Sequence, residues 1–264
     1  MTSYTPEIRI RFITALFSGV MFLSFSAYGS SGLNEHLVLA TTEMEPYTIN
    51  DSSHSGFLNE IVIQAYEHSG YSVKVIFLPW KRAVLSVKEG LHDGLVVANL
   101  NSEREAFMTY SKALIQTDFV FYKRAKNYID EDNLSNYRIG FVRGGVITKR
   151  FHTTKWLKKE ELRNTEHALK MLLASRIDLL ISQRLIIPYQ LESRGKSFEF
   201  EKIEVLNTVY ESIKAYTTIS KKKDNHEEII LNFNKGLEAL KNTGQYQNIL
   251  TKYKAESASV FPSN

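Results

Sequence analysis

The fold is decided by residues 72–105, which read "SVKVIFLPWKRAVLSVKEGLHDGLVVANLNSERE". The opening "SVKVIFL" is typical of a β-strand, and "WKRAVLSVKEG" has helical spacing and ends at Gly90, a residue that favours helix C-termini. The apolar run "GLVVA" that follows predicts a buried strand. The segment therefore predicts a strand–helix–strand unit, the building block of a largely parallel sheet.

The same alternation continues on both sides of this segment. Upstream, "LVLATT" (37–42) predicts a strand and "FLNEIVIQAYEHSG" (57–70) a helix with one apolar stripe, which completes a βαβαβ series. Downstream, a second series runs through residues 138–193: "RIGFV" as a strand, "GGVITKRFH" opening a helix, "TEHALKMLLAS" as a helix, "DLLIS" as a strand and "RLIIPYQLES" as a helix. We expect an α/β protein with two mixed, mostly parallel sheets and flanking helices.

Two extended stretches separate the series, "ALIQTDFVFYKRA" (113–125) and "YESIKAYTTIS" (210–220), and helical patterns follow the second one. Two crossings between the halves predict a discontinuous first lobe that is closed by the C-terminal helices. The predicted boundaries are a signal peptide over 1–29, a first lobe over 30–122 plus 213–264, and a second lobe over 123–212.

The N-terminus has the layout of a secretory signal peptide. Arg9 and Arg11 precede an apolar run over 12–25 that is short for a membrane span, and small residues follow it. Ala27 and Gly29 place the expected cleavage near Gly29; an uncleaved anchor is the alternative. Because the chain of 264 residues has no cysteine, we expect neither disulfides nor lipid attachment, and a free periplasmic protein of a double-membraned bacterium fits best.

Charge and composition exclude several functional classes. The formal net charge of +4, which falls to +3 without residues 1–29, is far below a nucleic-acid-binding footprint. The seven histidines have no metal-ligand spacing, and no nucleophile or nucleotide-binding motif occurs. We therefore expect no metal, no cofactor and no enzymatic activity.

Five stretches, in this order behind the predicted signal peptide, resemble the bacterial extracellular solute-binding proteins of family 3, the polar amino acid type that serves ABC importers. The stretches are "LVLATTEMEPYTI" (37–49), residues 56–105, "FMTYSKALIQTDFVFY" (107–122), "RIGFVRGG" (138–145) and "ALKMLLASRIDLLIS" (168–182). The resemblance implies the two-lobed periplasmic-binding-protein fold of type II, in which two hinge strands join the lobes. It also implies a monomer that closes over a small polar or anionic solute and meets a membrane ABC permease or a sensor protein.

The resemblance implies that Arg104, in "NSERE", grips a ligand carboxylate. A guanidinium suits this role because its planar fork donates two parallel hydrogen bonds and stays charged. Ser102 would add a hydroxyl, and backbone N–H groups near Asn99 would join. The alternative is an arginine in the first turn of a surface helix. Trp80, in "LPWKRA", is expected as an aromatic wall of the site, or else as a core residue.

The loop after the first strand contains Tyr47, which either lines the site or holds the loop in place. The same loop contains Glu43 and Glu45, which either contact a ligand ammonium or face water. In the second lobe, Gly144 and Gly145 allow close backbone approach to an anion, and Arg143 adds positive charge.

One position departs from the family pattern. Gln183 stands where amino-acid-binding relatives place an aspartate against the ligand ammonium, and an amide cannot compensate a buried charge as a carboxylate does. An ordinary α-amino acid is therefore in doubt as the ligand unless Glu43 or Glu45 substitutes. The leading hypothesis is a periplasmic solute-binding protein; the alternatives are a dehydratase-like enzyme on the same scaffold and a ligand-sensing partner of a membrane signalling protein.

Overall fold

The computed structural model describes Met1 and residues 35–51, 54–143 and 148–255. The chain divides into two units, Met1–Leu33 and Asn34–Asn264. The predicted signal peptide, apart from Met1, lies outside the described residues. All buried clusters belong to residues 37–255, so the second unit carries its own core.

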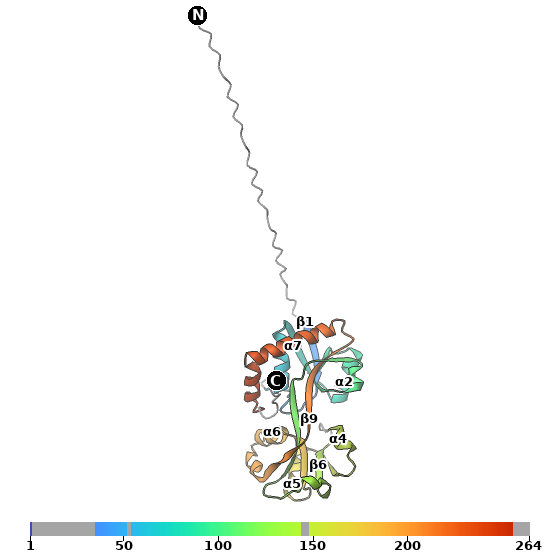
Figure 1. Cartoon of the computed structure of the whole chain (residues 1–264), viewed down its shortest axis with the longest axis vertical. Coiled ribbons are helices and arrows are strands. Elements are labelled where there is room, and N and C mark those ends of the chain that lie inside the picture. The colour runs from blue at the N-terminus through green and yellow to red at the C-terminus, as the bar shows by residue number, and fades with distance from the viewer. Residues whose placement is uncertain (2–34, 52–53, 144–147, 256–264) are drawn as a thin grey trace. The chain divides into compact units, whose positions relative to one another are not determined.

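The predicted βαβαβ series is present near the start of this unit (Figure 1). It consists of β1 (Glu35–Thr41), α1 (Phe57–Glu67), β2 (Tyr71–Phe77), α2 (Trp80–Glu89) and β3 (Gly94–Asn99). Strand β1 pairs in parallel with both β2 and β3. Helix α2 ends as expected, because Gly90 takes a left-handed conformation with φ 78° that a side chain disfavours.

The second series has the same parallel pairing. It consists of β6 (Arg138–Val142), α4 (Lys149–Thr153), β7 (Lys158–Leu162), α5 (Thr165–Leu173), β8 (Leu179–Gln183) and α6 (Ile186–Ser193). Strand β6 pairs in parallel with β7 and β8. Strand β7 was not predicted, because its sequence "KKEEL" lacks the apolar residues by which a strand is recognised.

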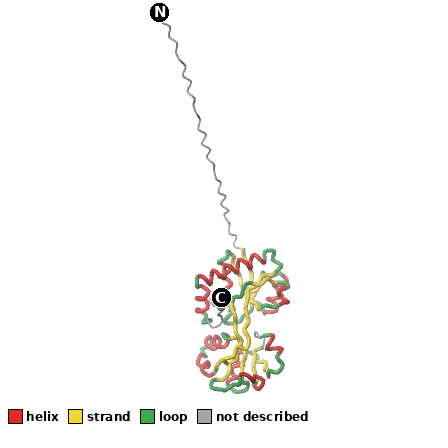
Figure 2. Tube along the Cα trace, viewed as in Figure 1, coloured by secondary structure: helices red, strands yellow, loops and turns green. Residues whose placement is uncertain are grey.

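Two long antiparallel strands connect the two series, as the paired vertical strands of Figure 2 show. They are β5 (Ile115–Arg124) and β9 (Ile203–Ser220), and β9 begins seven residues before the predicted crossing. Strand β9 also pairs with β3, and β5 also pairs with β8. The two parallel sets are therefore parts of one nine-stranded sheet in the order β2-β1-β3-β9-β5-β8-β6-β7, with β4 (Met108–Tyr110) paired to β9.

The remaining elements are α3 (Ser102–Glu105), the 3-10 helices η1 (Glu131–Asn136) and η2 (Ser197–Lys202), and the C-terminal helices α7 (His226–Asn242) and α8 (Gln245–Lys252). Helices α7 and α8 pack on the first series with α1. A Cβ at Gly236 of α7 would lie 1.9 Å from the carbonyl oxygen of Ala65 in α1, so only glycine permits this close helix contact.

The buried side chains form separate clusters at the two ends of the sheet. We call β1–β3 with α1–α3, α7 and α8 the first lobe, and β6–β8 with α4–α6 the second lobe. The largest cluster lies mainly in the first lobe, with Leu37, Ile61 and Phe233, and it also includes Leu185 from the start of α6. In β5, Phe119 and Tyr122 pack with second-lobe residues. We propose that the chain changes lobe within β5 and β9, a few residues from the predicted boundaries at 122 and 213.

Candidate functional site

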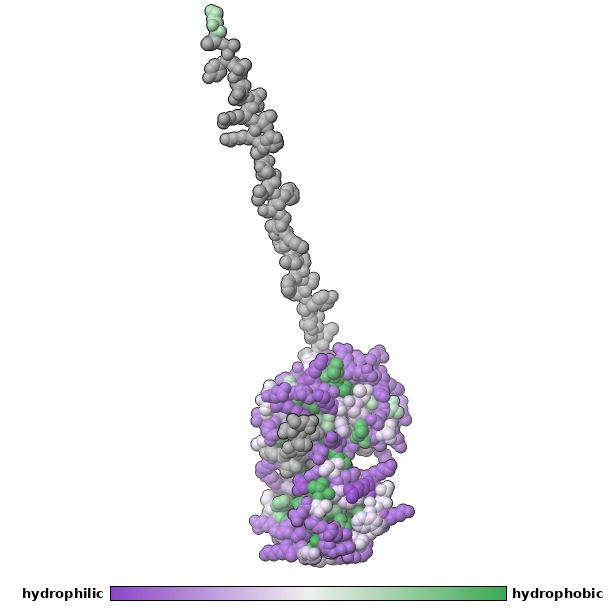
Figure 3. Space-filling model, in the orientation of Figure 1, coloured by the Kyte–Doolittle hydropathy of each residue, from purple (hydrophilic) through white to green (hydrophobic). Residues whose placement is uncertain are grey.

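A cavity of about 640 Å³ opens between the lobes. First-lobe residues on its wall are Thr42, Glu43, Met44, Glu45, Trp80, Val97, Ala98, Asn99 and Arg104. Second-lobe residues on its wall are Val142, Arg143, Thr165, Ile181, Ser182, Ile186 and Gln190. The volume is in the range of small-molecule sites. The space-filling view shows a hollow between the upper and lower parts of the folded unit (Figure 3).

The lining follows from the sheet topology. Parallel strands β3, β6 and β8 each contribute residues from their carboxyl ends, and α2 and α5 contribute their first residues, Trp80 and Thr165. In α/β sheets these ends collect loops and helix N-termini with unpaired N–H groups, which is where ligands bind.

Arg104 is held on the first-lobe wall by a set of neutral contacts. Its Nη2 donates to the carbonyl oxygen of Asn99 at 2.8 Å, and its Nε donates to the Tyr110 hydroxyl at 3.4 Å. Its backbone N–H donates to the Asn101 side chain, which caps α3, at 3.0 Å. Among the described residues, no carboxylate forms an ion pair with Arg104. The guanidinium is oriented by the protein, and its charge is left available.

Trp80 lies between a buried cluster and the cavity. Its ring packs against the buried cluster of Ala83, Leu95 and Met108 and also lines the cavity. The Arg104 guanidinium carbon lies 5.5 Å from the ring centroid, within cation–π range. The indole therefore fixes the arginine and supplies a flat wall beside it.

Two carboxylates line the same cavity. Glu43 accepts a hydrogen bond from the backbone N–H of Asn50 at 3.3 Å, and Glu45 follows it by two residues. Neither is ion-paired within the part of the chain that the structure describes. The first-lobe wall thus offers one cationic group and two anionic groups to a solute.

The second-lobe wall is more neutral. Arg143 lines the cavity, but its side chain is 73% exposed and forms an ion pair with Glu161. The hydroxyls of Thr165 and Ser182 and the amide of Gln190 supply neutral polar groups. The expected contribution of Gly144 and Gly145 falls outside the described residues.

The sequence did not predict the second-lobe wall residues Val142, Thr165, Ile181, Ser182, Ile186 and Gln190, nor the first-lobe wall residues Thr42, Met44, Val97 and Ala98. Thr165 and Ser182 had a detectable signal, because one begins a helix and the other stands at a strand end. Ile186 and Gln190 had none, since their position depends on how α6 packs.

Three predicted site residues do not line the cavity. Tyr47 is a core residue, 1% exposed, with its ring 5.1 Å from that of Phe57. Its hydroxyl shares a hydrogen bond of 2.9 Å with that of Thr117, and burial raises the pKa of Tyr47. The loop aromatic therefore staples the loop to the core, which was the alternative interpretation. Ser102 is exposed as the first residue of α3 and does not face the cavity.

Gln183 is the third of these residues. It is 3% exposed, pairs with Phe119 of β5 at the end of β8, and lies outside the cavity lining. Its Oε1 has no hydrogen-bond partner among the described atoms. Ser182, one position earlier, lines the cavity instead.

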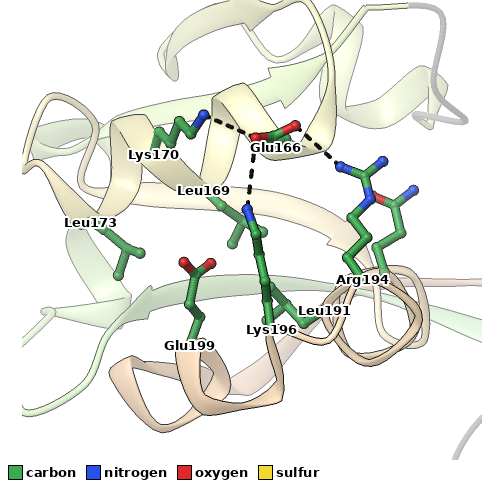
Figure 4. Close-up of a pocket in the computed structure, with 9 residues that line it drawn as sticks. Glu166, Leu169, Lys170, Leu173, Leu191, Arg194, Lys196 and Glu199 are labelled. Carbon is green, nitrogen blue, oxygen red and sulfur yellow. Dashed lines mark hydrogen bonds and ion pairs between the residues drawn. The ribbon is translucent and has the colours of Figure 1, made fainter.

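A second, much smaller pocket of about 40 Å³ lies within the second lobe (Figure 4). Glu166 of α5 occupies it, and three cations converge on that carboxylate: Lys170 at 2.9 Å, Arg194 at 3.4 Å and Lys196 at 3.8 Å. The hydrogen bond and charge of Lys170, with the charges of Lys196 and Arg194, lower the pKa of Glu166. We interpret this cluster as a surface ion-pair network that ties α5 to α6 and η2.

The described residues hold neither a metal-ligand cluster nor a helix suited to a membrane. No three histidine or acidic side chains gather there as metal ligands do. In the same part of the chain, no helix has the length and apolar character needed to cross a bilayer.

Comparison with known proteins gives a family and a fold. The sequence profile of "Bacterial extracellular solute-binding proteins, family 3" matches residues 37–256. No curated protein sequence matches significantly. The structure is similar to the second substrate-binding domain of a putative amino acid ABC transporter from Streptococcus pneumoniae, with 19% identity, a TM-score of 0.65, and coverage of 83% of this chain and 99% of that one.

Two further structures have the same fold. One is the GluR0 ligand-binding core from Nostoc punctiforme in complex with L-glutamate, with 17% identity, a TM-score of 0.64, and coverage of 83% and 99% of the two chains. The other is a histidine kinase sensor domain with similarity to periplasmic binding proteins, with 16% identity, a TM-score of 0.65, and coverage of 83% and 95%. These neighbours are type II periplasmic binding proteins in fold, which confirms the predicted fold class.

Proposed function

Because the chain belongs to family 3 of the bacterial extracellular solute-binding proteins, we propose that it binds a small carboxylate-bearing solute in the interlobe cavity. Arg104 carries this proposal. It is a guanidinium held on the cavity wall by neutral partners, without a carboxylate of the described chain to neutralise it. A carboxylate that enters the cavity can accept two charge-assisted hydrogen bonds from such a fork.

The nature of the solute follows from the acidic side chains. Gln183 is buried away from the cavity, so it offers no contact to an ammonium group, but Glu43 and Glu45 both line it. We propose that these glutamates compensate the ammonium of an amino acid or a related zwitterion. The named ligand of one structural neighbour, L-glutamate, belongs to this class.

The solute would be retained by closure of the two lobes. A ligand favours the closed form only through contacts that it makes to both lobes. A ligand that binds the open and closed forms equally well does not shift the equilibrium between them. In this proposal Arg104 and Trp80 act from the first lobe, and Thr165 and Ser182 act from the second.

Delivery to a membrane partner is the last part of the proposal. A mature chain from about Ser30 onward would work in the periplasm and pass its solute to an ABC importer. Similarity to an amino acid ABC transporter domain supports this choice. Similarity to a histidine kinase sensor domain supports the second candidate, a ligand-dependent sensor partner, with the same cavity in use.

A thermal-shift screen of the chain from Ser30 onward tests solute capture. Amino acids, their deaminated analogues and small amines are the probes. A solute present at about a hundred times its dissociation constant should add about 2.7 kcal/mol to the free energy of unfolding. The absence of stabilisation by any carboxylate would contradict the proposal. Mass spectrometry of the bound solute separates binding from turnover, and we expect the solute to be recovered unchanged.

A further inference from the structure

We propose that the second lobe carries a docking face for an anionic phospholipid surface, formed by α4, the loop after it and strand β7. The cationic side chains of this face are Lys149, Arg150, Lys155, Lys158, Lys159 and Arg163, and Trp156 lies among them. We call this set the basic face. Helix α4 lies on the side of the second lobe away from α6 (Figure 1).

The basic face carries a clear excess of positive charge. Residues 148–163 hold six lysines and arginines against two glutamates, a net charge of +4. The whole chain also has a net charge of +4, so the other residues together are neutral. Clusters of four to eight such cations are the pattern that anionic lipid surfaces attract.

The basic face is not neutralised by the protein around it. Arg150 Nη1 donates to the carbonyl oxygen of Tyr210 at 2.6 Å, and Lys159 Nζ donates to that of His152 at 2.9 Å. These partners orient the side chains but carry no charge. Within the described ranges, none of the six cations forms an ion pair.

Ion pairs do occur at some lysines elsewhere in the chain. Lys112 pairs with Glu238, Lys123 with Glu204 and Lys252 with Glu60. The positive charge of the basic face is therefore available to a partner outside the chain.

Trp156 distinguishes a lipid partner from an acidic protein. Its side chain is 59% exposed between Lys155 and Lys158, whereas Leu157 beside it is 5% exposed and anchors the loop. An indole exposed on a fixed loop and surrounded by cations has the amphipathic character of residues at the headgroup level of membranes.

Protection of a sheet edge does not explain all the cations of the basic face. Strand β7 is the last strand of the sheet, and lysines on such an edge discourage pairing with other chains. That reason covers Lys158 and Lys159 only. Lys149, Arg150, Lys155 and Trp156 lie on α4 and the loop, where no strand edge needs protection.

Vesicle binding of the chain from Ser30 onward tests the proposal, since the described core lies entirely within that part. Vesicles of equimolar phosphatidylglycerol and phosphatidylcholine are compared with pure phosphatidylcholine at low salt by co-sedimentation. We expect binding to the anionic vesicles only. The double substitution Lys155→Gln/Lys158→Gln should weaken it roughly 30-fold, because each cation near an anionic surface contributes about a fivefold factor.

The control removes the same charge from the first lobe. Lys221→Gln/Lys222→Gln should leave vesicle binding within about twofold of the wild type, because the attraction falls off within a Debye length. An equal loss in the control variant would overturn the proposal, since net charge alone would then explain binding. Absence of binding to anionic vesicles would overturn it as well.

Fluorescence reports on Trp156 directly, as the chain has only two tryptophans. Anionic vesicles should shift the emission of the wild type to shorter wavelength, and Trp156→Phe should abolish the shift. Soluble polyglutamate serves as the competing partner. Binding to polyglutamate without binding to vesicles would identify an acidic protein surface as the partner and overturn the lipid proposal. Solute binding is measured separately in all variants and should not change.

Discussion

The guanidinium carbon of Arg104 lies 5.5 Å from the centre of the Trp80 ring, and both side chains line the cavity between the lobes. The two residues come from different helices of the first lobe, α3 and α2. Their contact fixes the guanidinium against the indole on the cavity wall. Preorganisation reduces the conformational cost of binding.

Arg104→Lys tests this contact. A lysine keeps the charge but loses the planar fork and its stacking on the indole, so we expect the dissociation constant of a carboxylate solute to rise about 10-fold to 100-fold. Isothermal titration with the tightest solute from the thermal-shift screen measures it. The matched control is Arg176→Gln, an exposed arginine in the turn between α5 and β8. Unchanged affinity in Arg104→Lys would exclude direct recognition by the guanidinium.

Glu43→Gln/Glu45→Gln tests the assignment of the ammonium site. The double variant should weaken binding of an amino acid at least about tenfold, because a buried ammonium loses its counter-charge. Binding of the deaminated analogue should not weaken. Glu67→Gln/Glu228→Gln, two exposed positions with the same change of charge, serves as the control. If binding of the amino acid and of its deaminated analogue weakens equally, the glutamates do not recognise the ammonium group.

Tyr47→Phe tests whether Tyr47 stabilises the core or binds the solute. It removes the buried hydroxyl that shares a hydrogen bond with Thr117, so we expect a loss of about 1 kcal/mol in the free energy of unfolding. The melting temperature should fall by about 2–4 °C for a chain of this size. Solute affinity should stay the same. Tyr128→Phe, at a side chain that is 86% exposed, should change neither quantity. A change in solute affinity without a change in the free energy of unfolding would show that Tyr47 contributes to solute binding.

Glu131 predicts a pH effect on stability. Its carboxylate accepts hydrogen bonds from the backbone N–H groups of Thr208 at 2.9 Å and Asn207 at 3.3 Å. The hydrogen bonds with Thr208 lower the pKa of Glu131, and the bond from Asn207 adds to the effect. A folded-state pKa below the unfolded value means that this stabilisation is present above the unfolded pKa and is lost as the pH falls through the folded one.

Urea unfolding of wild type and Glu131→Gln measures this effect. The wild type should be more stable at pH 7, by less than about 1 kcal/mol because the group is partly exposed and solvent screens it. The difference should shrink as the pH falls below the unfolded-state pKa and through the lowered folded-state pKa of Glu131. A difference that does not change with pH would assign the effect to geometry and not to ionisation.

The sequence predicted those parts of the fold that local patterns determine. The βαβαβ series and the helix end at Gly90 follow from apolar spacing and from the preference of glycine for positive φ. Strand β7 was missed because its partner β6, and not its own composition, makes "KKEEL" extended. The long span of β9 was underestimated for a similar reason, since its first residues are held by pairing with β5.

Part of the cavity wall was predictable from family motifs near strand ends, as at Asn99, Trp80 and Arg104. Tyr47 and Gln183 show the limit. Both lie in segments that border the cavity, but the direction of each side chain depends on what it packs against: Phe57 in one case and the neighbouring strand β5 in the other. The positions of Ile186 and Gln190 depend on how α6 packs, which no local pattern encodes.

The antiparallel ladder between β5 and β9 runs from one lobe into the other without a break in the sheet, and its register shifts on both sides of Val120. Bulges of this kind concentrate bending and twist in a strand pair while the flanking hydrogen bonds persist. We therefore expect β5 and β9 to bend together while the hydrogen bonds between them stay intact. In the proposed function, release of the solute would let this strand pair relax without local unfolding.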